Sequence, residues 1–423
     1  MRVLFTLLPA GGLAHLIPLI ALQKMLPSSS ESAFLVPQFR HKFLRQYGLD
    51  VLDIDHQDLF NNGFRTEMLA YGKFKPDVVI DDSSFTTGIT IQMSKAARVA
   101  IQRTGMFPGG KPRNDQHVHS MGELDMKEVP DVTFMGLKQP GCFTDLFEAE
   151  AKIVPGLKPV ELLPETLRDP DSYFFSGPLI IEDYLAQEKG VTFMQVSKEN
   201  QHIASLTSFD PVREFFDANS ERNIVYTTLG TIAVNDTPEP VTEAIKRLLD
   251  DDVAVVSSIN VPNLTDSQAS RFYFASYLPM HFVCSNVDLV VHHCGSGTYH
   301  YPIIHEVPTI TVGTGCYDRE DVAVRLEELG VSEHLTEPNR PDFVERFTAA
   351  VARVFDDPES LGRRKQNLAA LNEELRNTQA SFNLEQVLGS AIDRKRPAKK
   401  REARAQNRPQ DRERLVSHKR SPQ

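Results

Sequence analysis

Cysteine is scarce in the sequence, and long apolar runs are absent. The four cysteines match neither the spacing of a disulfide framework nor that of a zinc site; they are Cys142, Cys284, Cys294 and Cys316. No stretch approaches the roughly 18 consecutive apolar residues that a membrane span needs. We therefore expect free thiols in a reducing compartment, and a soluble, cytoplasmic protein without a transmembrane segment.

The first residues raise one alternative to a cytoplasmic location. Arg2 followed by the apolar run 3–8 pairs a positive charge with a hydrophobic stretch, as a secretory signal does. Gly11, Gly12 and His15 interrupt that run. A buried strand that opens into a loop and a helix explains the same residues more simply.

Charge is unevenly distributed along the 423 residues. The whole chain has a net charge of −11, but residues 391–423 hold twelve Lys and Arg against four Asp and Glu, which leaves −19 for the remainder. This basic segment has few apolar residues with which to pack, so we expect a solvated, disordered tail over 391–423. Contact of the tail with nucleic acid, an anionic membrane or an acidic partner is the alternative.

The order of predicted elements indicates an α/β protein with two domains. Short apolar runs alternate with amphipathic segments, a pattern typical of parallel sheets with helical crossovers. Strands are expected at 3–8, 33–37, 77–80, 223–228, 253–257 and 287–292, and helices at 16–25, 87–97 and 240–249. Because the order restarts near residue 222, we expect two doubly wound domains, 1–205 and 206–390, with a ligand cleft at the carboxyl ends of the strands.

The segment 287–298, which reads VDLVVHHCGSGT, is the most informative. It predicts a buried strand that leads through a loop of small residues into a helix, and small residues allow close approach of the backbone to a ligand. Thr298 is expected to cap that helix, and Pro302 to lie in its first turn. The free N–H groups at such a helix start can hold an anionic diphosphate. A plain turn with two incidental histidines is the alternative.

This segment resembles the donor-binding signature of the family 1 glycosyltransferases, in which HHGGxGT is followed by a GVP turn and a D-Q pair. The segments 307–310, 318 and 323–331 continue the resemblance, 277–279 resembles the family's base-stacking segment, and 224–231 resembles its VYVSFGS strand and turn. The resemblance extends to bacterial macrolide and natural-product enzymes. It implies the GT-B fold, with two Rossmann-like domains that face each other across a cleft, and a UDP- or dTDP-linked sugar as co-substrate without any cofactor or metal.

The resemblance also implies roles for individual residues. His293 would contact the diphosphate with Thr231 beside it, Tyr277 would stack on the base, and Asp318 would bind sugar hydroxyls. Backbone and hydroxyl donors to the diphosphate would come from Gly295, Ser296, Gly297 and Thr298. Some positions depart from the family pattern: Tyr301 replaces the ribose-binding glutamate, Arg319 the glutamine of the D-Q pair, and Glu306 the glycine of the GVP turn. They indicate either an altered donor preference or lost catalysis.

The first domain is expected to supply the base. Residues 11–18 resemble the family's GHxxP loop, which makes His15 the base that takes the proton of an acceptor hydroxyl. Asp82, after the predicted strand 77–80, would orient the ring of His15, with Asp81 as the alternative. A second alternative is that both aspartates cap the next turn. Residues 106–120 are a candidate acceptor loop.

These features predict an inverting, metal-independent glycosyltransferase that acts on a small, hydrophobic, natural-product-like acceptor. A sugar-nucleotide epimerase or hydrolase with the same framework is one alternative, and a catalytically degenerate protein that binds a nucleotide sugar or a partner is another. The DxD patterns at 53–55 and 169–171 are those of metal-dependent transferases of a different fold, but short motifs need a matching context. The sequence is also compatible with a homo-oligomer.

Overall fold

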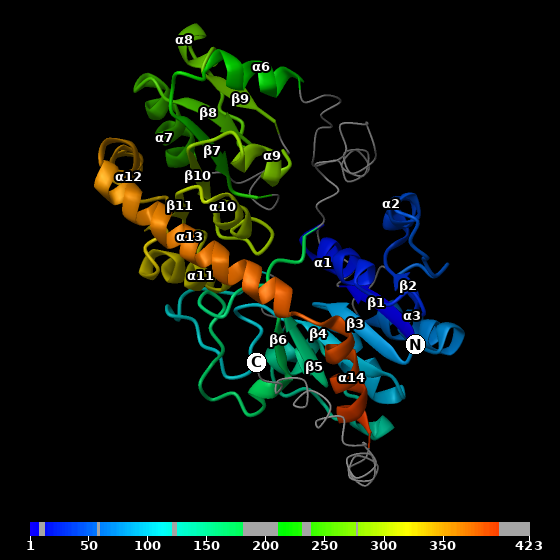
Figure 1. Cartoon of the computed structure of the whole chain (residues 1–423). Helices are drawn as coiled ribbons and strands as arrows, with labels where there is room; N and C mark the ends of the chain where they lie inside the picture. The colour runs from blue at the N-terminus through cyan, green and yellow to red at the C-terminus, as the bar shows by residue number, and fades with distance from the viewer. Residues whose placement is uncertain are drawn as a thin grey trace, which may run out of the picture.

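The computed structural model describes residues 1–7, 13–56, 60–120, 125–180, 210–230, 238–275 and 278–396. These residues form two parallel sheets of six strands each, and helices cover both faces of each sheet (Figure 1). The two sheets belong to the first and second halves of the chain. The predicted α/β architecture with two doubly wound domains is therefore confirmed.

The first sheet has the strand order β2-β1-β3-β4-β5-β6, and all neighbouring pairs are parallel. Its strands are β1 (Arg2–Leu7), β2 (Glu31–Leu35), β3 (Val78–Asp82), β4 (Ala97–Ile101), β5 (Ala151–Val154) and β6 (Tyr173–Phe175). Every residue of β3 and β4 is buried, as expected for parallel strands with helices on both faces. The helices of this half are α1 (Leu13–Lys24), α2 (His41–Gln46), α3 (Asn61–Phe74) and α4 (Thr87–Thr90).

The second sheet has the order β12-β11-β10-β7-β8-β9, again all parallel. Its strands are β7 (Ile224–Thr228), β8 (Ala254–Ser257), β9 (Phe272–Phe274), β10 (Leu289–His292), β11 (Thr309–Val312) and β12 (Ser332–Leu335). Its helices are α6 (Asp210–Ala218), α7 (Glu239–Asp250), α8 (Asp266–Ala269), α9 (Met280–Cys284), α10 (His300–His305), α11 (Tyr317–Glu328) and α12 (Phe343–Asp356). Side chains of α7 and α12 share one core cluster with the sheet, and those of α6, α9 and α10 share another.

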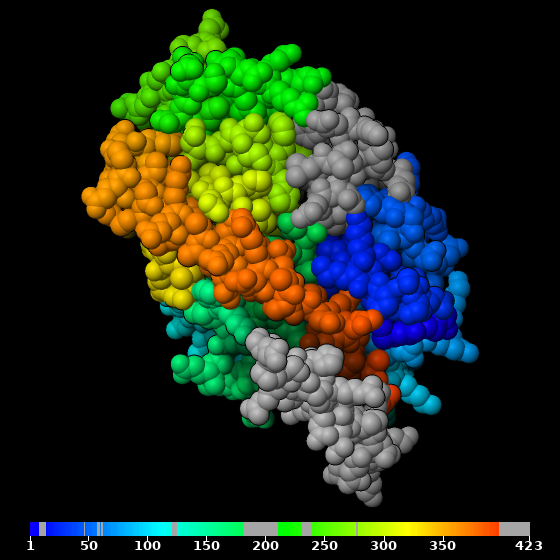
Figure 2. All heavy atoms as spheres, in the orientation of Figure 1, coloured from blue at the N-terminus to red at the C-terminus, as the bar shows by residue number. Residues whose placement is uncertain are grey.

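The last two helices return the chain to the first domain. The long helix α13 (Pro358–Ser381) starts beside α12, and its far end donates a hydrogen bond from Gln379 to the carbonyl of Pro178. The final helix α14 (Leu384–Lys395) packs on β3, β4 and β5 (Figure 1). In the space-filling view α13 crosses from one half of the molecule to the other in orange (Figure 2). The core of the first sheet includes Leu384, Val387, Leu388 and Ala391.

The return of the chain corrects the predicted tail. Residues 391–395 are the last turns of α14, and Ala391 is fully buried, because this helix has an apolar face toward the first sheet. The remainder of the predicted tail, 397–423, lies outside the described residues, as does the predicted domain boundary at 205/206. The boundary at 205/206 stays a prediction. Residues 384–390 were assigned to the second domain, but helix α14, which contains them, packs in the core of the first sheet.

One predicted helix is wrong. Residues 87–97 were expected to form a single helix, but α4 ends at Thr90, one 3₁₀ turn follows at Ile91–Met93, and Ala97 begins β4. Ser94 has an extended backbone, so the helix cannot continue. Tertiary contacts explain the short α4, since Thr86, Thr87 and Thr90 all donate hydrogen bonds to the buried carboxylate of Glu67.

Further 3₁₀ turns are found at Gln38–Arg40, Met126–Glu128, Thr133–Met135, Phe143–Phe147 and Pro170–Ser172. Among the described residues, none of the helices has the length and apolar character needed to cross a membrane. All four cysteines are free thiols, as expected.

Candidate active site

The predicted base and the residue predicted to orient it lie together at the carboxyl end of β3. His15 is on the first turn of α1, and Asp82 is the last residue of β3. The Nδ1 atom of His15 lies 2.8 Å from Oδ1 of Asp82. The side chain of His15 is 19% exposed, whereas that of Asp82 is fully buried. The ring can therefore reach a ligand while its partner is held in the interior.

Asp82 has a second partner that the sequence analysis missed. Arg103, two residues after β4, binds both oxygens of Asp82, with NH1 at 2.8 Å from Oδ1 and NH2 at 2.7 Å from Oδ2. Burial alone would raise the pKa of Asp82, but Arg103 and His15 outweigh burial and hold that pKa well below its ordinary value. Asp82 is thus a carboxylate at neutral pH. Arg103 was missed because no strand was predicted at residues 97–101 and no motif includes Arg103.

The neighbouring Asp81 faces the other side of the sheet. Successive side chains of a strand point to opposite faces, so only one of the two aspartates can face α1. Asp81 accepts two hydrogen bonds from the guanidinium of Arg98, at 2.7 and 2.9 Å. The geometry therefore favours Asp82 over Asp81 as the partner of His15.

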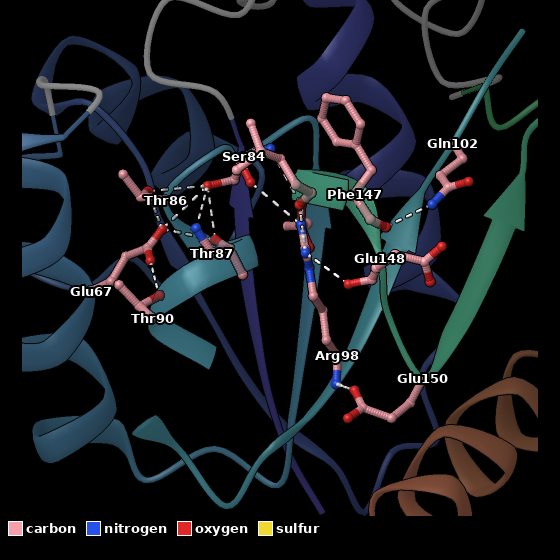
Figure 3. Close-up of polar contacts among 12 residues, drawn as sticks. Glu67, Ser84, Thr86, Thr87, Thr90, Arg98, Gln102, Phe147, Glu148 and Glu150 are labelled. Carbon is pink, nitrogen blue, oxygen red and sulfur yellow. Dashed lines mark hydrogen bonds and ion pairs between the residues drawn. The ribbon is translucent and has the colours of Figure 1, made fainter. Parts of the chain in front are cut away.

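A buried polar network surrounds the Asp81 side of the strand (Figure 3). Arg98 also donates to the carbonyls of Leu146, Glu148 and Ser84. The carboxylate of Glu67, on α3, accepts hydrogen bonds from four hydroxyl groups, those of Ser84, Thr86, Thr87 and Thr90. These bonds fix the chain just after Asp82, and no local pattern in the sequence indicates them.

His293 follows β10 and lies between two glycines. A Cβ placed on Gly295 would be 2.4 Å from Nε2 of His293, and a Cβ placed on Gly230 would be 2.5 Å from its Cε1. Both distances are far below van der Waals contact, so only glycine leaves room for the ring. Burial, with smaller contributions from Arg319 and His292, lowers the pKa of His293 well below its ordinary value. His293 is therefore neutral and able to donate one N–H bond.

The loop 295–298 lies against the first domain. A Cβ placed on Gly297 would be 3.5 Å from the Cβ of Ala14, the residue before His15. The predicted base and the predicted diphosphate loop are thus neighbours, although they are 280 residues apart in the chain. Gly295, Ser296 and Thr298 are half-buried, and Gly297 is exposed.

The predicted cap of the following helix is wrong. Helix α10 begins at His300, its cap position is Tyr299, and no side chain caps it. The backbone N–H of Thr298 instead donates to the carbonyl of Gly295 at 2.8 Å, which makes a turn before the helix. Pro302 lies in the first turn of α10, as expected.

Two non-glycine residues have backbones in the left-handed region where the family motif has glycine. Cys294 has a φ of 56°, and Glu306, at the glycine position of the GVP turn, has a φ of 55°. The side chain of Glu306 accepts a hydrogen bond from Asn372 at 2.9 Å. The glycine-like turn is therefore retained at both positions, in spite of the conformational cost to a residue with a Cβ.

Asp318 contacts the first domain directly. Its two oxygens accept hydrogen bonds from the backbone N–H of Ser120 at 2.8 Å and from the Ser120 hydroxyl at 2.6 Å. Arg319 is half-buried and close enough to His293 to lower its pKa. Each Asp318 oxygen keeps a further lone pair, so the carboxylate can still accept a hydrogen bond from a ligand.

The remaining predicted site residues are not found beside His15, His293 and Asp318 among the described residues. Tyr301 is 8% exposed and packs in the core of the second domain, edge-on to His281 with ring centroids 4.8 Å apart. Thr231 and Tyr277 lie outside the described residues. Among the described residues, no three His, Cys, Asp or Glu side chains are grouped to hold a metal ion.

Hydrogen bonds tie the two domains together around this site. The hydroxyl of Tyr299 donates to Glu161 at 2.9 Å, and the other oxygen of Glu161 accepts the backbone N–H of Thr104 at 2.7 Å. The hydroxyl of Tyr317 donates to the carbonyl of Gly105 at 2.9 Å. These bonds join the segment after β4 to the residues that follow the glycine-rich loop.

Solved structures with the same architecture define the class of fold. The chain has a TM-score of 0.64 with the glycosyltransferase of kitacinnamycin, at 14% identity, over 94% of this chain and 99% of that one. It has a TM-score of 0.58 with the spinosyn rhamnosyltransferase SpnG complexed with thymidine diphosphate, at 16% identity, over 89% of this chain and 96% of that one. The chain therefore has the GT-B fold of glycosyltransferases.

The second domain is also matched in sequence. Residues 249–375 match the family model described as the erythromycin biosynthesis protein CIII-like C-terminal domain. The resemblance to natural-product glycosyltransferases of family 1 is thereby confirmed.

Two curated relatives match about a third of this chain. The 4'-demethylrebeccamycin synthase of Lentzea aerocolonigenes is 27% identical over 36% of this chain and 35% of that protein. The 3-alpha-mycarosylerythronolide B desosaminyl transferase of Saccharopolyspora erythraea is 28% identical over 35% of each. These alignments span about a third of the length of either relative.

Proposed function

We propose that this protein is an inverting, metal-independent glycosyltransferase that moves a sugar from a nucleoside diphosphate to a hydroxyl of a small, hydrophobic, natural-product-like acceptor. The observation that carries the proposal is the position of His15, hydrogen-bonded to Asp82 and adjacent to the glycine-rich loop of the second domain. A base and a diphosphate site must be neighbours in a direct sugar transfer.

His15 acts as the base in this proposal. The hydrogen bond from Nδ1–H to Asp82 leaves Nε2 as an acceptor for the proton of the attacking hydroxyl. The acceptor oxygen then bonds to the anomeric carbon while the bond from that carbon to the diphosphate oxygen breaks. One displacement of this kind inverts the anomeric carbon. Asp82 orients the ring and stabilises the imidazolium that forms.

The glycine-rich loop and His293 receive the departing diphosphate. Negative charge grows on the leaving oxygen in the transition state, and donors already aimed at that position stabilise it most. His293 is neutral because of burial, so it contributes one N–H donor, and Gly295, Ser296, Gly297 and Thr298 contribute backbone and hydroxyl donors. Asp318 accepts hydrogen bonds from hydroxyls of the transferred sugar, and no metal takes part.

The donor nucleotide is proposed from similar proteins. SpnG, which shares the fold, has been solved with thymidine diphosphate, and the curated relatives are named as synthases or transferases of natural products. A thymidine or uridine diphosphate sugar is therefore the donor that we propose for this chain.

Diphosphate release tests this function. The protein is incubated with a panel of uridine and thymidine diphosphate sugars, with and without a mixture of polyphenol, macrolide and sterol acceptors, in the presence of a chelator. Release that depends on the acceptors is the expected result. Release without acceptor would contradict it and indicate a hydrolase or epimerase, and no release with any donor would indicate a binding protein.

A further inference from the structure

Two buried arginine–aspartate pairs lie on opposite faces of the first sheet, one between β3 and β4 and the other between β3 and the residues just after β4, and their surroundings differ. Arg98 binds Asp81, and Arg103 binds Asp82, each through two hydrogen bonds. Both arginines are nearly or completely buried. The pairs therefore have the same chemistry, and only their neighbours can give them different roles.

The first pair is enclosed by the polar network of the fold (Figure 3). The other N–H groups of Arg98 donate to three backbone carbonyls, so its guanidinium connects β4 to the chain around Leu146 and Glu148. None of these partners belongs to the proposed active site. The Arg98–Asp81 pair is accounted for by this structural role.

The second pair faces the proposed active site. Arg103 donates to Asp82 and, at 3.4 Å, to the carbonyl of Ala14, which precedes His15. Its Nε is buried without a hydrogen-bond partner among the described residues. The contacts of Arg103 are concentrated on Asp82 and the start of α1.

We propose that Arg103 is a positioning residue of the His15–Asp82 pair, which fixes the direction of the Asp82 carboxylate and limits how strongly that carboxylate favours a protonated His15. The inference rests on the proposed function and extends it to a third residue. Oδ1 of Asp82 is shared by His15, Ser83 and Arg103, while Oδ2 is bound by Arg103. Arg103 therefore sets which carboxylate oxygen faces the imidazole.

The charge of Arg103 has a consequence for proton release. A carboxylate beside an imidazole favours the imidazolium, and a guanidinium bound to the same carboxylate opposes that effect. A base must lose its proton again after each transfer, so too strong a partner would slow turnover. The titratable or charged groups around Arg103 are His15 on α1, Asp82 on β3, Glu161 after β5, Tyr299 just before α10 and His300 on α10.

The test compares Arg103→Gln with the wild-type protein. The titration of the His15 ring is followed by NMR, with the signal assigned from the spectrum of His15→Gln. Loss of the guanidinium charge favours the imidazolium, so the ring should titrate at a higher pH in Arg103→Gln than in the wild-type protein, as removal of a nearby positive charge predicts. The acidic limb of the pH profile of kcat/KM should move in the same direction. An unchanged titration would overturn the proposal.

Two further variants make the test specific. Arg103→Lys keeps the charge but cannot form the two parallel bonds, so it should titrate as the wild type while kcat falls by about tenfold; wild-type kcat in Arg103→Lys would contradict a positioning role. Arg98→Lys is the matched control, which should lower the melting temperature and leave the titration of His15 unchanged. Because the NMR titration needs no turnover, failure of this inference is distinguishable from failure of the proposed transferase activity.

Discussion

Ser120 and Asp318 come from different domains, and the serine donates two hydrogen bonds to the aspartate, one from its backbone and one from its hydroxyl. The residue proposed to bind the sugar is therefore oriented by the first domain. The proposed donor site is therefore complete only when the two domains are in contact.

Removing these groups should weaken use of the donor. Ser120→Ala loses one hydrogen bond to a charged group and should raise the donor KM by about fivefold to tenfold, with kcat little changed. Asp318→Asn should lower kcat/KM by about 10- to 100-fold, because a charged hydrogen-bond acceptor for the sugar is lost.

Asp321→Asn is the control for this pair. Asp321 is on the same helix, and among the described residues its carboxylate accepts one hydrogen bond, from the backbone N–H of Arg113 at 3.3 Å. Steady-state kinetics with varied donor should separate the variants. A donor KM that is unchanged in both Ser120→Ala and Asp318→Asn would remove Asp318 from the sugar site.

Replacement of the proposed base should abolish turnover but not donor binding. His15→Ala should reduce kcat by roughly two to four orders of magnitude, the usual contribution of a positioned proton acceptor. The nucleotide should still raise the melting temperature, because the site proposed for it is in the second domain. Diphosphate release and thermal-shift titration measure the two effects, and a variant that retains wild-type turnover would exclude His15 as the base.

The glycines beside His293 should be intolerant of any side chain. In Gly295→Ala the new Cβ would overlap Nε2 of His293, so the ring must move, and the free energy of unfolding should fall by about 1–3 kcal/mol. The affinity for nucleoside diphosphate should fall with it.

Gly297→Ala provides the comparison within the same loop. Its Cβ would be 3.5 Å from Ala14, an ordinary contact, so the free energy of unfolding should hardly change. Urea unfolding of both variants gives the measurement. Equal stabilities would show that the space around His293 is not as tight as the distances indicate.

Three buried histidines should make the protein less stable in mild acid. Burial lowers the pKa of His281 to about 4, and the pKa values of His292 and His300 to about 3. In the unfolded chain these rings take up protons near pH 6.5. The stabilisation is present above pH 6.5 and is lost as the pH falls toward the folded pKa values, since the unfolded state then binds more protons.

The size of this effect can be checked with one variant. Each ring lowers the free energy of unfolding by at most about 1.4 kcal/mol per pH unit between about pH 6 and pH 4. His300→Gln should reduce the slope by about that amount, as measured by urea unfolding at pH 7.5, 6 and 5. An identical slope in the variant would mean that His300 is protonated in the folded protein.

The sequence predicted those parts of the molecule that depend on local pattern. Parallel strands are buried on both faces, so β1, β7 and β10 appear as short apolar runs, and the loop after β10 is recognisable from its small residues. His15 and Asp82 were found because each follows a predicted strand in the order typical of the family.

Contacts between distant segments could not be predicted in this way. Glu161 and Tyr299 are separated by 138 positions, and neither is part of a local pattern. Arg103 was missed because it belongs to no motif and lies 21 positions from Asp82, so its role depends on contacts made in the folded chain. The contacts of Glu161, Tyr299 and Arg103 therefore depend on tertiary structure, and the spacing of residues in the sequence does not predict them.

The position of α14 governs when the first domain can finish folding. Four of its buried side chains belong to the core of the first sheet, yet they are among the last of the described residues to leave the ribosome. Until residue 391 has been synthesised, the apolar surface that α14 covers on β3, β4 and β5 stays open to water or to chaperones. The core of the first domain therefore cannot be complete until the whole of the second sheet has been synthesised.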